Sequence, residues 1–241
     1  MKVSSTDMQN NFGKYLRLCN KEDIVITKNG KSIAKLIDCT TKDQDKLQIK
    51  EEAEEYLKSN KVSYEEFIKL TEKSEERYEY IDGEMYLLAL PKIVHQFVIT
   101  KLMINFGNFF NGKKCIPFAS PCDITLKREE KNINVVQPDV MIICDLEEKM
   151  DERGYYIGQP SLVVEIISES SRNKDYIKKL DLYMSCGIEE YWIINPINKE
   201  VSIFNFNKKD IKQNATFKYN EKAKSFIFEG LSVNLENIFM N

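Results

Sequence analysis

The chain has 241 residues, of which 42% are hydrophobic and 30% charged, and its net charge is −3. This composition excludes a disordered or collagen-like chain, and the acidic balance argues against a general nucleic-acid coat. The sequence contains no apolar run of the roughly 18 residues that a membrane span requires, and no signal-like segment leads it. We therefore expect a cytoplasmic protein without a membrane partner.

Charge is distributed unevenly along the chain. Residues 1–40 contain seven Lys and Arg against four Asp and Glu, which gives +3 and leaves −6 for the remainder. Such asymmetry indicates two modules with different partners. We predict a first module at 1–45, a helical linker at 46–60 and a second module at 61–241.

The first module is predicted to be a helix followed by a hairpin. Ser4 or Ser5 can cap a helix that runs to about Cys19. Two β-prone runs, 23–27 and 32–37, flank an Asn-Gly pair, the strongest short hairpin signal. A fold of this size without a disulfide or a metal needs a partner surface, so we expect a homodimer or a higher homo-oligomer.

The second module begins with a helix at Ser63, where Glu66 completes a capping-box pattern. A hairpin turns at Asp82-Gly83, and Pro91 opens a long helix to about Phe110. A further helix, capped by Ser170 or Ser171, ends before Gly187, and a short helix closes the chain. The remaining runs predict strands at 114–118, 122–127, 135–143, 160–168, 189–195, 200–206, 215–219 and 224–229. The fold class is therefore α/β (α+β), with a mixed β-sheet flanked by helices.

The six cysteines are scattered, without a Cys-x-x-Cys pair, and the chain has a single histidine. These features argue against a Cys/His zinc site. We expect buried, reduced thiols instead. The residues concerned are Cys19, Cys39, Cys115, Cys122, Cys144 and Cys186.

Two carboxylates interrupt apolar, β-prone runs. Asp139 follows Pro138 at the start of one run, and Glu165 lies within Val-Val-Glu-Ile-Ile. Strands that are buried on both faces exclude a carboxylate unless a metal, a proton or a cation satisfies it. Hard oxygen ligands favour Mg²⁺ or Mn²⁺, which could assist phosphodiester cleavage. The alternative is structural: Asp139 caps a turn and Glu165 pairs with a lysine.

Asp175, Lys179 and Tyr183 are spaced i, i+4 and i+8, on one face of the helix that follows Glu165. Lys179 could orient the attacking water or stabilise the transition state, with Asp175 and Tyr183 as accessory residues. Taken alone, the spacing favours the alternative, an ordinary acid–base pair on a solvated face. Lys178, the neighbour of Lys179, is rotated by about 100° around the helix and therefore lies on another face.

Other candidates have weaker signals. Glu79 could reach the acids as an accessory catalytic residue, although a glutamate on an edge strand needs no function. His95 could line the site or be structural. In the first helix, a basic and amide-rich set could bind DNA phosphates and base edges, or form a solvated face. That set comprises Lys2, Gln9, Asn10, Asn11, Lys14 and Arg17.

Residues 1 to about 40 resemble the Phd/YefM antitoxin family, through Val3-Ser4-Ser5-Thr6-Asp7-Met8-Gln9-Asn10-Asn11-Phe12, residues 24–31 and residues 34–37. The resemblance implies a dimeric, DNA-binding fold that represses its own operon. It also implies a toxin partner.

Residues 62–206 resemble the Uma-type restriction endonucleases, a branch of the PD-(D/E)XK nuclease superfamily. The matching pieces are Arg77-Tyr78-Glu79, Asp82-Gly83, His95-Gln96, Gln137-Pro138-Asp139-Val140, Val164-Glu165-Ile166-Ile167-Ser168, Asp175…Lys179…Tyr183 and Gly187…Glu190-Tyr191-Trp192. The superfamily places a lysine two residues after the glutamate, where this chain has Ile167. In this branch the lysine is moved to the following helix, which singles out Lys179.

The sequence thus predicts an Mg²⁺-dependent (or Mn²⁺-dependent) DNA endonuclease with an antitoxin-like, DNA-binding first module. Asp139 and Glu165 would hold the metal. One alternative is a non-catalytic toxin–antitoxin-type transcriptional regulator that keeps the nuclease fold as a scaffold. Another is that the first module restrains the nuclease in cis.

Overall fold

The structure is a computed structural model that describes residues 2–19, 23–28, 30–36, 61–72, 74–168 and 171–240. The chain divides into two compact units, Met1–Asn60 and Lys61–Asn241. The predicted linker helix at 46–60 lies outside the described residues, so the domain boundaries remain predictions. Among the described residues, no helix is long and apolar enough to cross a membrane.

In the first unit, two short helices pack on a three-stranded sheet. The predicted helix is divided at Asn11 into α1 (Ser5–Asn10) and α2 (Phe12–Leu18), and Ser4 caps α1 by accepting from the Asp7 N–H. The hairpin is present as β2 (Ile24–Lys28) and β3 (Lys31–Leu36). An additional strand, β1 (Lys2–Ser4), pairs in parallel with β2 and was not predicted. A separate small core holds these elements together, formed by Val3, Met8, Tyr15, Cys19 and Ile24.

The second unit is built around a six-stranded sheet with the order β13-β12-β11-β10-β9-β6. Its central strands are β9 (Val140–Ile143), β10 (Leu162–Ile166) and β11 (Glu190–Asn195). Strand β10 runs parallel to β11 and antiparallel to β9. The outer strands are β6 (Ile116–Ala119), β12 (Glu200–Asn207) and β13 (Asp210–Lys218).

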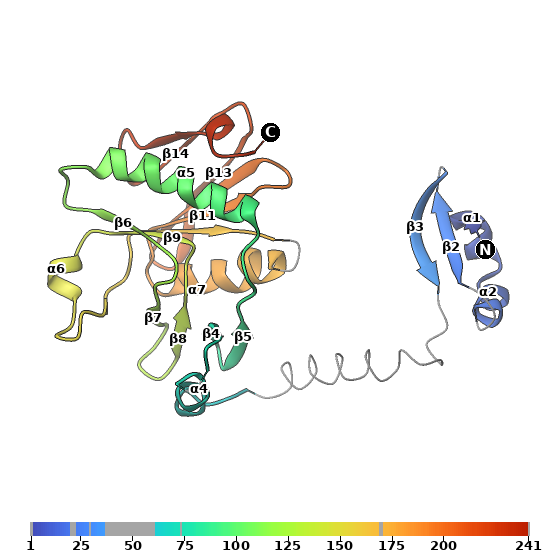
Figure 1. Cartoon of the computed structure of the whole chain (residues 1–241), viewed down its shortest axis with the longest axis horizontal. Helices are drawn as coiled ribbons and strands as arrows, with labels where there is room; N and C mark the ends of the chain where they lie inside the picture. Colours follow the sequence, from blue (N-terminus) through green and yellow to red (C-terminus); the bar gives the residue numbers. More distant parts are fainter. Residues whose placement is uncertain are drawn as a thin grey trace. The chain divides into compact units, whose positions relative to one another are not determined.

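Helices cover both faces of this sheet, as Figure 1 shows for α5 and α7. Helix α5 (Ile93–Phe110) packs Val98, Leu102 and Phe106 on one face. The opposite face receives α7 (Leu180–Ser185), which follows η1 (Lys174–Lys179), a π-helical turn. Because side chains alternate along a strand, the central strands are apolar on both sides.

A second, four-stranded sheet packs against the α7 face with the order β5-β4-β8-β7. It contains β4 (Tyr78–Ile81), β5 (Glu84–Leu87), β7 (Ile124–Lys127) and β8 (Ile133–Val136). On its other face lies α4 (Tyr64–Thr71), which begins with the predicted capping box and packs Phe67 on Tyr80.

The predicted strand at 135–143 is two strands in two sheets. Residues 133–136 pair with β7 and β4, whereas residues 140–143 pair with β6 and β10. The chain crosses between the sheets at Gln137-Pro138-Asp139, where Pro138 has no N–H to donate to a ladder. This crossing places Asp139 immediately before the first residue of β9.

The prediction of a strand near the C-terminus was wrong. The strand expected at 224–229 is a turn between β14 (Lys222–Lys224) and β15 (Ser232–Asn234), followed by a short 3-10 helix, η2 (Leu235–Asn237). The N–H groups of Phe226 and Ile227 donate to the Glu190 carboxylate instead of to a ladder.

The thiol prediction was also wrong for one pair of cysteines, since Cys115 and Cys144 form a disulfide. Antiparallel pairing of Ile116 with Ile143 places the two flanking cysteines opposite each other. Cys19 and Cys186 are buried, as expected, whereas Cys122 is a half-buried free thiol. Cys39 lies outside the described residues.

Candidate active site

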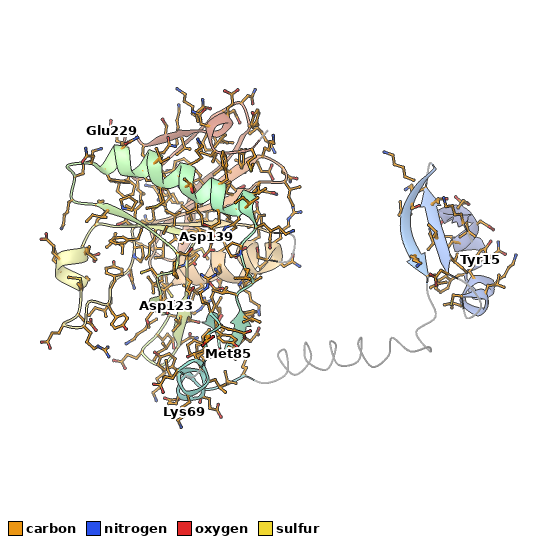
Figure 2. The ribbon with its side chains drawn as sticks, viewed as in Figure 1. Tyr15, Lys69, Met85, Asp123, Asp139 and Glu229 are labelled. Atoms are coloured by element: carbon orange, nitrogen blue, oxygen red, sulfur yellow. A yellow bond between two sulfur atoms is a disulfide. The ribbon has the colours of Figure 1, made fainter. Side chains whose placement is uncertain are left out.

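Asp139 and Glu165 come together where β9 begins and β10 ends. The Asp139 carboxylate accepts a hydrogen bond from the Ile166 N–H through Oδ2 at 2.7 Å, so it lies against the backbone beside Glu165. In the view of Figure 2, Asp139 lies between α5 and α7, and 15% of its side chain is exposed. The structure therefore brings together the two acids that the sequence singled out.

His95, at the first turn of α5, contacts the same oxygen of Asp139, with Nε2 3.1 Å away. Its other ring nitrogen, Nδ1, is buried without a hydrogen-bond partner in the structure. The sequence left open whether His95 lines the site, and the structure places it there.

Glu165 is buried and held by two side chains from the following helix. Lys179 Nζ lies 2.7 Å from Oε1, and the Tyr183 hydroxyl donates to the same oxygen at 2.6 Å. Asp175 is also buried, and its Oδ1 lies 3.9 Å from Lys179 Nζ. The predicted face of Asp175, Lys179 and Tyr183 is thus turned inward, whereas Lys178 pairs with Glu84 and Tyr86.

Glu79 reaches the same cluster from β4 of the smaller sheet. Its Oε1 lies 2.6 Å from Lys179 Nζ and accepts from the Gln137 N–H at 3.2 Å. Its Oε2 accepts from Lys174 Nζ at 2.7 Å. Lys174 was not predicted, because nothing distinguishes it in a lysine-rich segment until the helix geometry is known.

Charge in this cluster is set by burial and by the two lysines. Burial raises the pKa of Glu165 well above its ordinary value, and Lys179 only partly opposes that effect. Burial also disfavours the charge of Glu79, but Lys179 and Lys174 outweigh it and hold the pKa of Glu79 below its usual range. Burial disfavours the Lys179 ammonium too, yet the surrounding carboxylates keep its pKa well above the ordinary value. The cluster therefore pairs ionised Glu79 with cationic Lys179 and favours a proton on Glu165.

The oxygen donors suit a hard divalent cation. In the described part of the chain, no group of three or more His, Cys, Asp or Glu side chains is arranged to hold a metal. Mg²⁺, however, keeps several waters and is commonly bound by one or two carboxylates. The contacts described for Asp139 use Oδ2 and those for Glu165 use Oε1, which leaves one oxygen of each acid for a cation. The residues therefore fit such an ion.

The predicted DNA-binding side chains lie on the first unit. Lys2, Gln9 and Lys14 are exposed, and the Lys14 ammonium lies 5.5 Å from the centre of the Tyr15 ring. The side chains of Asn10 and Arg17 fall outside the described residues. DNA binding by these residues stays a prediction.

A mixed sheet that presents two acids beside a helical lysine defines a restriction-endonuclease-like class of fold. The chain belongs to the Uma2 family, whose model carries the description "Putative restriction endonuclease" and matches residues 64–236. A second family model, "Antitoxin Phd_YefM, type II toxin-antitoxin system", matches residues 1–76. Both resemblances inferred from the sequence are confirmed.

The chain is also similar to two individual proteins. The chain is 27% identical over 148 residues to the uncharacterized protein slr1290 of Synechocystis, covering 61% of this chain and 75% of that protein. The crystal structure of a putative nuclease of the DUF820 group from Anabaena variabilis is 17% identical, with a TM-score of 0.59. That similarity covers 74% of this chain and 97% of the other, and it shows the fold.

Proposed function

We propose that residues 61–241 form a divalent-metal-dependent endonuclease that hydrolyses phosphodiester bonds in DNA. The observation that carries the proposal is the way in which Asp139 and Glu165 are held. Asp139 is held through one oxygen by Ile166 and His95. Glu165 is likewise held through one oxygen by Lys179 and Tyr183. The other oxygen of each is left for a shared cation.

Mg²⁺ or Mn²⁺ bound there would neutralise charge at the scissile phosphate and lower the pKa of a bound water. The protein's own contribution is to orient the donors. Tyr183 and Lys179 fix the rotamer of Glu165, and the Ile166 N–H fixes that of Asp139. Lys179 also supplies the positive charge that we expect to support the attacking water or the transition state.

The proposal is tested by nicking of supercoiled plasmid in Mg²⁺, Mn²⁺ or EDTA. We expect the wild type to cleave with metal, and Asp139→Ala and Glu165→Ala to reduce cleavage at least about a hundredfold, since metal assistance contributes several kcal/mol. Glu147→Gln changes an exposed acid and should behave as wild type. Metal-dependent cleavage that survives both alanine substitutions would exclude this assignment.

A second function is supported by the antitoxin model that matches residues 1–76. In it, the chain is a non-catalytic regulator whose first unit binds an operator, or a toxin, as a dimer. It would bind its own promoter tightly and with strong salt dependence, and it would not cleave DNA with any divalent metal. Electrophoretic mobility-shift assays with the promoter, run alongside the nicking assay, distinguish the two functions.

A further inference from the structure

Glu79 holds two lysines at once. Lys174 Nζ lies 2.7 Å from its Oε2 and Lys179 Nζ lies 2.6 Å from its Oε1, while the carboxylate is fully buried. The Gln137 N–H donates to Oε1 as well. Since these partners occupy both oxygens, Glu79 is arranged to position the two lysine ammonium groups and not to bind a metal ion.

The π-helical turn makes this double contact possible. Lys174 and Lys179 are five residues apart, which would put them about 140° apart around an α-helix at about 100° per residue. A π-helix closes i→i+5 bonds, so residues five apart lie one turn above each other. Both lysines therefore face Glu79 from η1.

The two lysines differ in what their ammonium groups can still bind. Lys179 is surrounded by Glu165, Glu79 and Asp175, and 3% of its side chain is exposed. Lys174 makes its described ion pair with Glu79 alone, and 18% of its side chain is exposed. An ammonium group has three donors, so Lys174 keeps donors that can reach an incoming anion.

The surroundings of Lys174 suit a nucleic-acid backbone. Its ammonium lies 5.3 Å from the centre of the Tyr86 ring, and Lys178 lies 5.2 Å from the same ring. Two ammonium groups thus lie near one aromatic side chain, and single-strand binding sites combine positive charge and aromatic rings in this way.

We infer that Lys174 is a further substrate-binding residue of this site, which donates to a phosphate oxygen of the bound nucleic-acid strand, and that Glu79 is its positioning residue. The inference rests on the proposed function for the identity of the substrate. It assigns to Lys174 a role in binding, while Lys179 stays within the carboxylate cluster.

The kinetic test compares Lys174→Met, Lys174→Arg and Lys212→Met with wild type. Lys212 is the control, because it is an exposed lysine on β13, the outer strand of the six-stranded sheet, and not on η1. We expect Lys174→Met to raise KM about tenfold with a smaller change in kcat, as removal of one charge-assisted hydrogen bond predicts. Lys174→Arg should restore most of the affinity. Glu79→Gln should also raise KM, because it releases Lys174.

A second measurement does not depend on cleavage. Full-length protein is treated with an amine-reactive acetylating reagent, with and without a short oligonucleotide in EDTA, and lysine labelling is read by peptide mass spectrometry. We expect the oligonucleotide to protect Lys174 and to leave the labelling of the exposed Lys212 unchanged. Equal labelling of Lys174 in both samples, or an unchanged KM in Lys174→Met, would overturn the inference. Absence of cleavage by wild type would instead overturn the proposed function, and protection of Lys174 would still report its contact with the strand.

Discussion

At the scale of single residues, Glu165 sets the charge state of the carboxylate cluster. It lies on a strand that is buried on both faces, within reach of Lys179, Tyr183 and Asp139. A carboxylate in such a place is satisfied by a proton or by a cation. Protonation and metal binding at Glu165 are therefore alternatives, which links metal affinity to pH.

This gives a prediction for the pH dependence of stability. The folded chain holds a proton on Glu165 at pH values where the unfolded chain has released it, because burial raises the pKa. Stability is then greatest below the ordinary glutamate pKa and falls as pH rises towards the raised one. We expect the free energy of unfolding in EDTA to fall as the pH rises above the ordinary glutamate pKa, by up to about 1.4 kcal/mol per pH unit.

Urea unfolding at several pH values measures this effect. Glu165→Gln has no proton to release at this position, so its profile should be flatter than that of wild type. Asp175, whose pKa burial also raises, is present in both proteins and contributes to both profiles. Parallel profiles would show that Glu165 does not carry the predicted proton.

At the scale of elements, the crossing between sheets and the π-helical turn build the site. The segment Gln137-Pro138-Asp139 connects the end of β8 to the start of β9 and so links the two sheets. The π turn then directs Lys174 and Lys179 to Glu79, which comes from the smaller sheet. The acids and lysines thus meet where the two sheets and α7 pack together.

The disulfide gives a prediction at this scale, because it joins the segments that flank β6 and β9 across a sequence separation of 29. Replacing both Cys115 and Cys144 by serine should lower the free energy of unfolding by about 3.6 kcal/mol under oxidising conditions, the decrease expected for a loop of this length. Urea unfolding measures the difference.

Reduction provides the control. In dithiothreitol, the wild type and the double serine variant should unfold at similar urea concentrations. Thiol titration of denatured wild type should also find two more free thiols after reduction than before. An equal titre in both samples would contradict the disulfide.

At the scale of the whole molecule, each unit has its own core. The first unit is held by Val3, Met8, Tyr15 and Ile24, and none of the clusters of the second unit includes these described side chains. Separate cores predict separate folding, since each unit buries its own apolar surface.

We therefore expect the fragment 61–241 to unfold cooperatively, with a midpoint close to that of the corresponding transition in the full chain. Differential scanning calorimetry measures both. A fragment without a cooperative transition would show that the first unit is needed for folding of the second.

The same fragment tests whether the first unit restrains the nuclease in cis. Under restraint, nicking by the fragment should exceed that of the full chain at equal concentration. If the two units act independently, the fragment should keep the nicking rate of the full chain. Its DNA affinity should depend less on salt: the slope of log affinity against log salt concentration should fall by about 0.9 for each DNA phosphate that the first unit neutralises.

Local patterns were sufficient for most elements and for the identity of the central acids. The capping box at Ser63, the turn at Asp82-Gly83 and the apolar runs around Asp139 and Glu165 are short-range signals, and the structure contains them as expected. Such signals arise from backbone donors, turn geometry and burial, which neighbouring residues largely determine.

Tertiary structure alone decided which distant side chains meet. The division of 135–143 between two sheets, the pairing of Cys115 with Cys144 and the contact of Glu79 with Lys174 each depend on strand order or on a π turn. No local pattern encodes these features, because they result from packing among elements far apart in the chain. The sequence therefore determined which acids, Glu79 among them, and which lysine to consider, and the fold determined that Lys174 joins them.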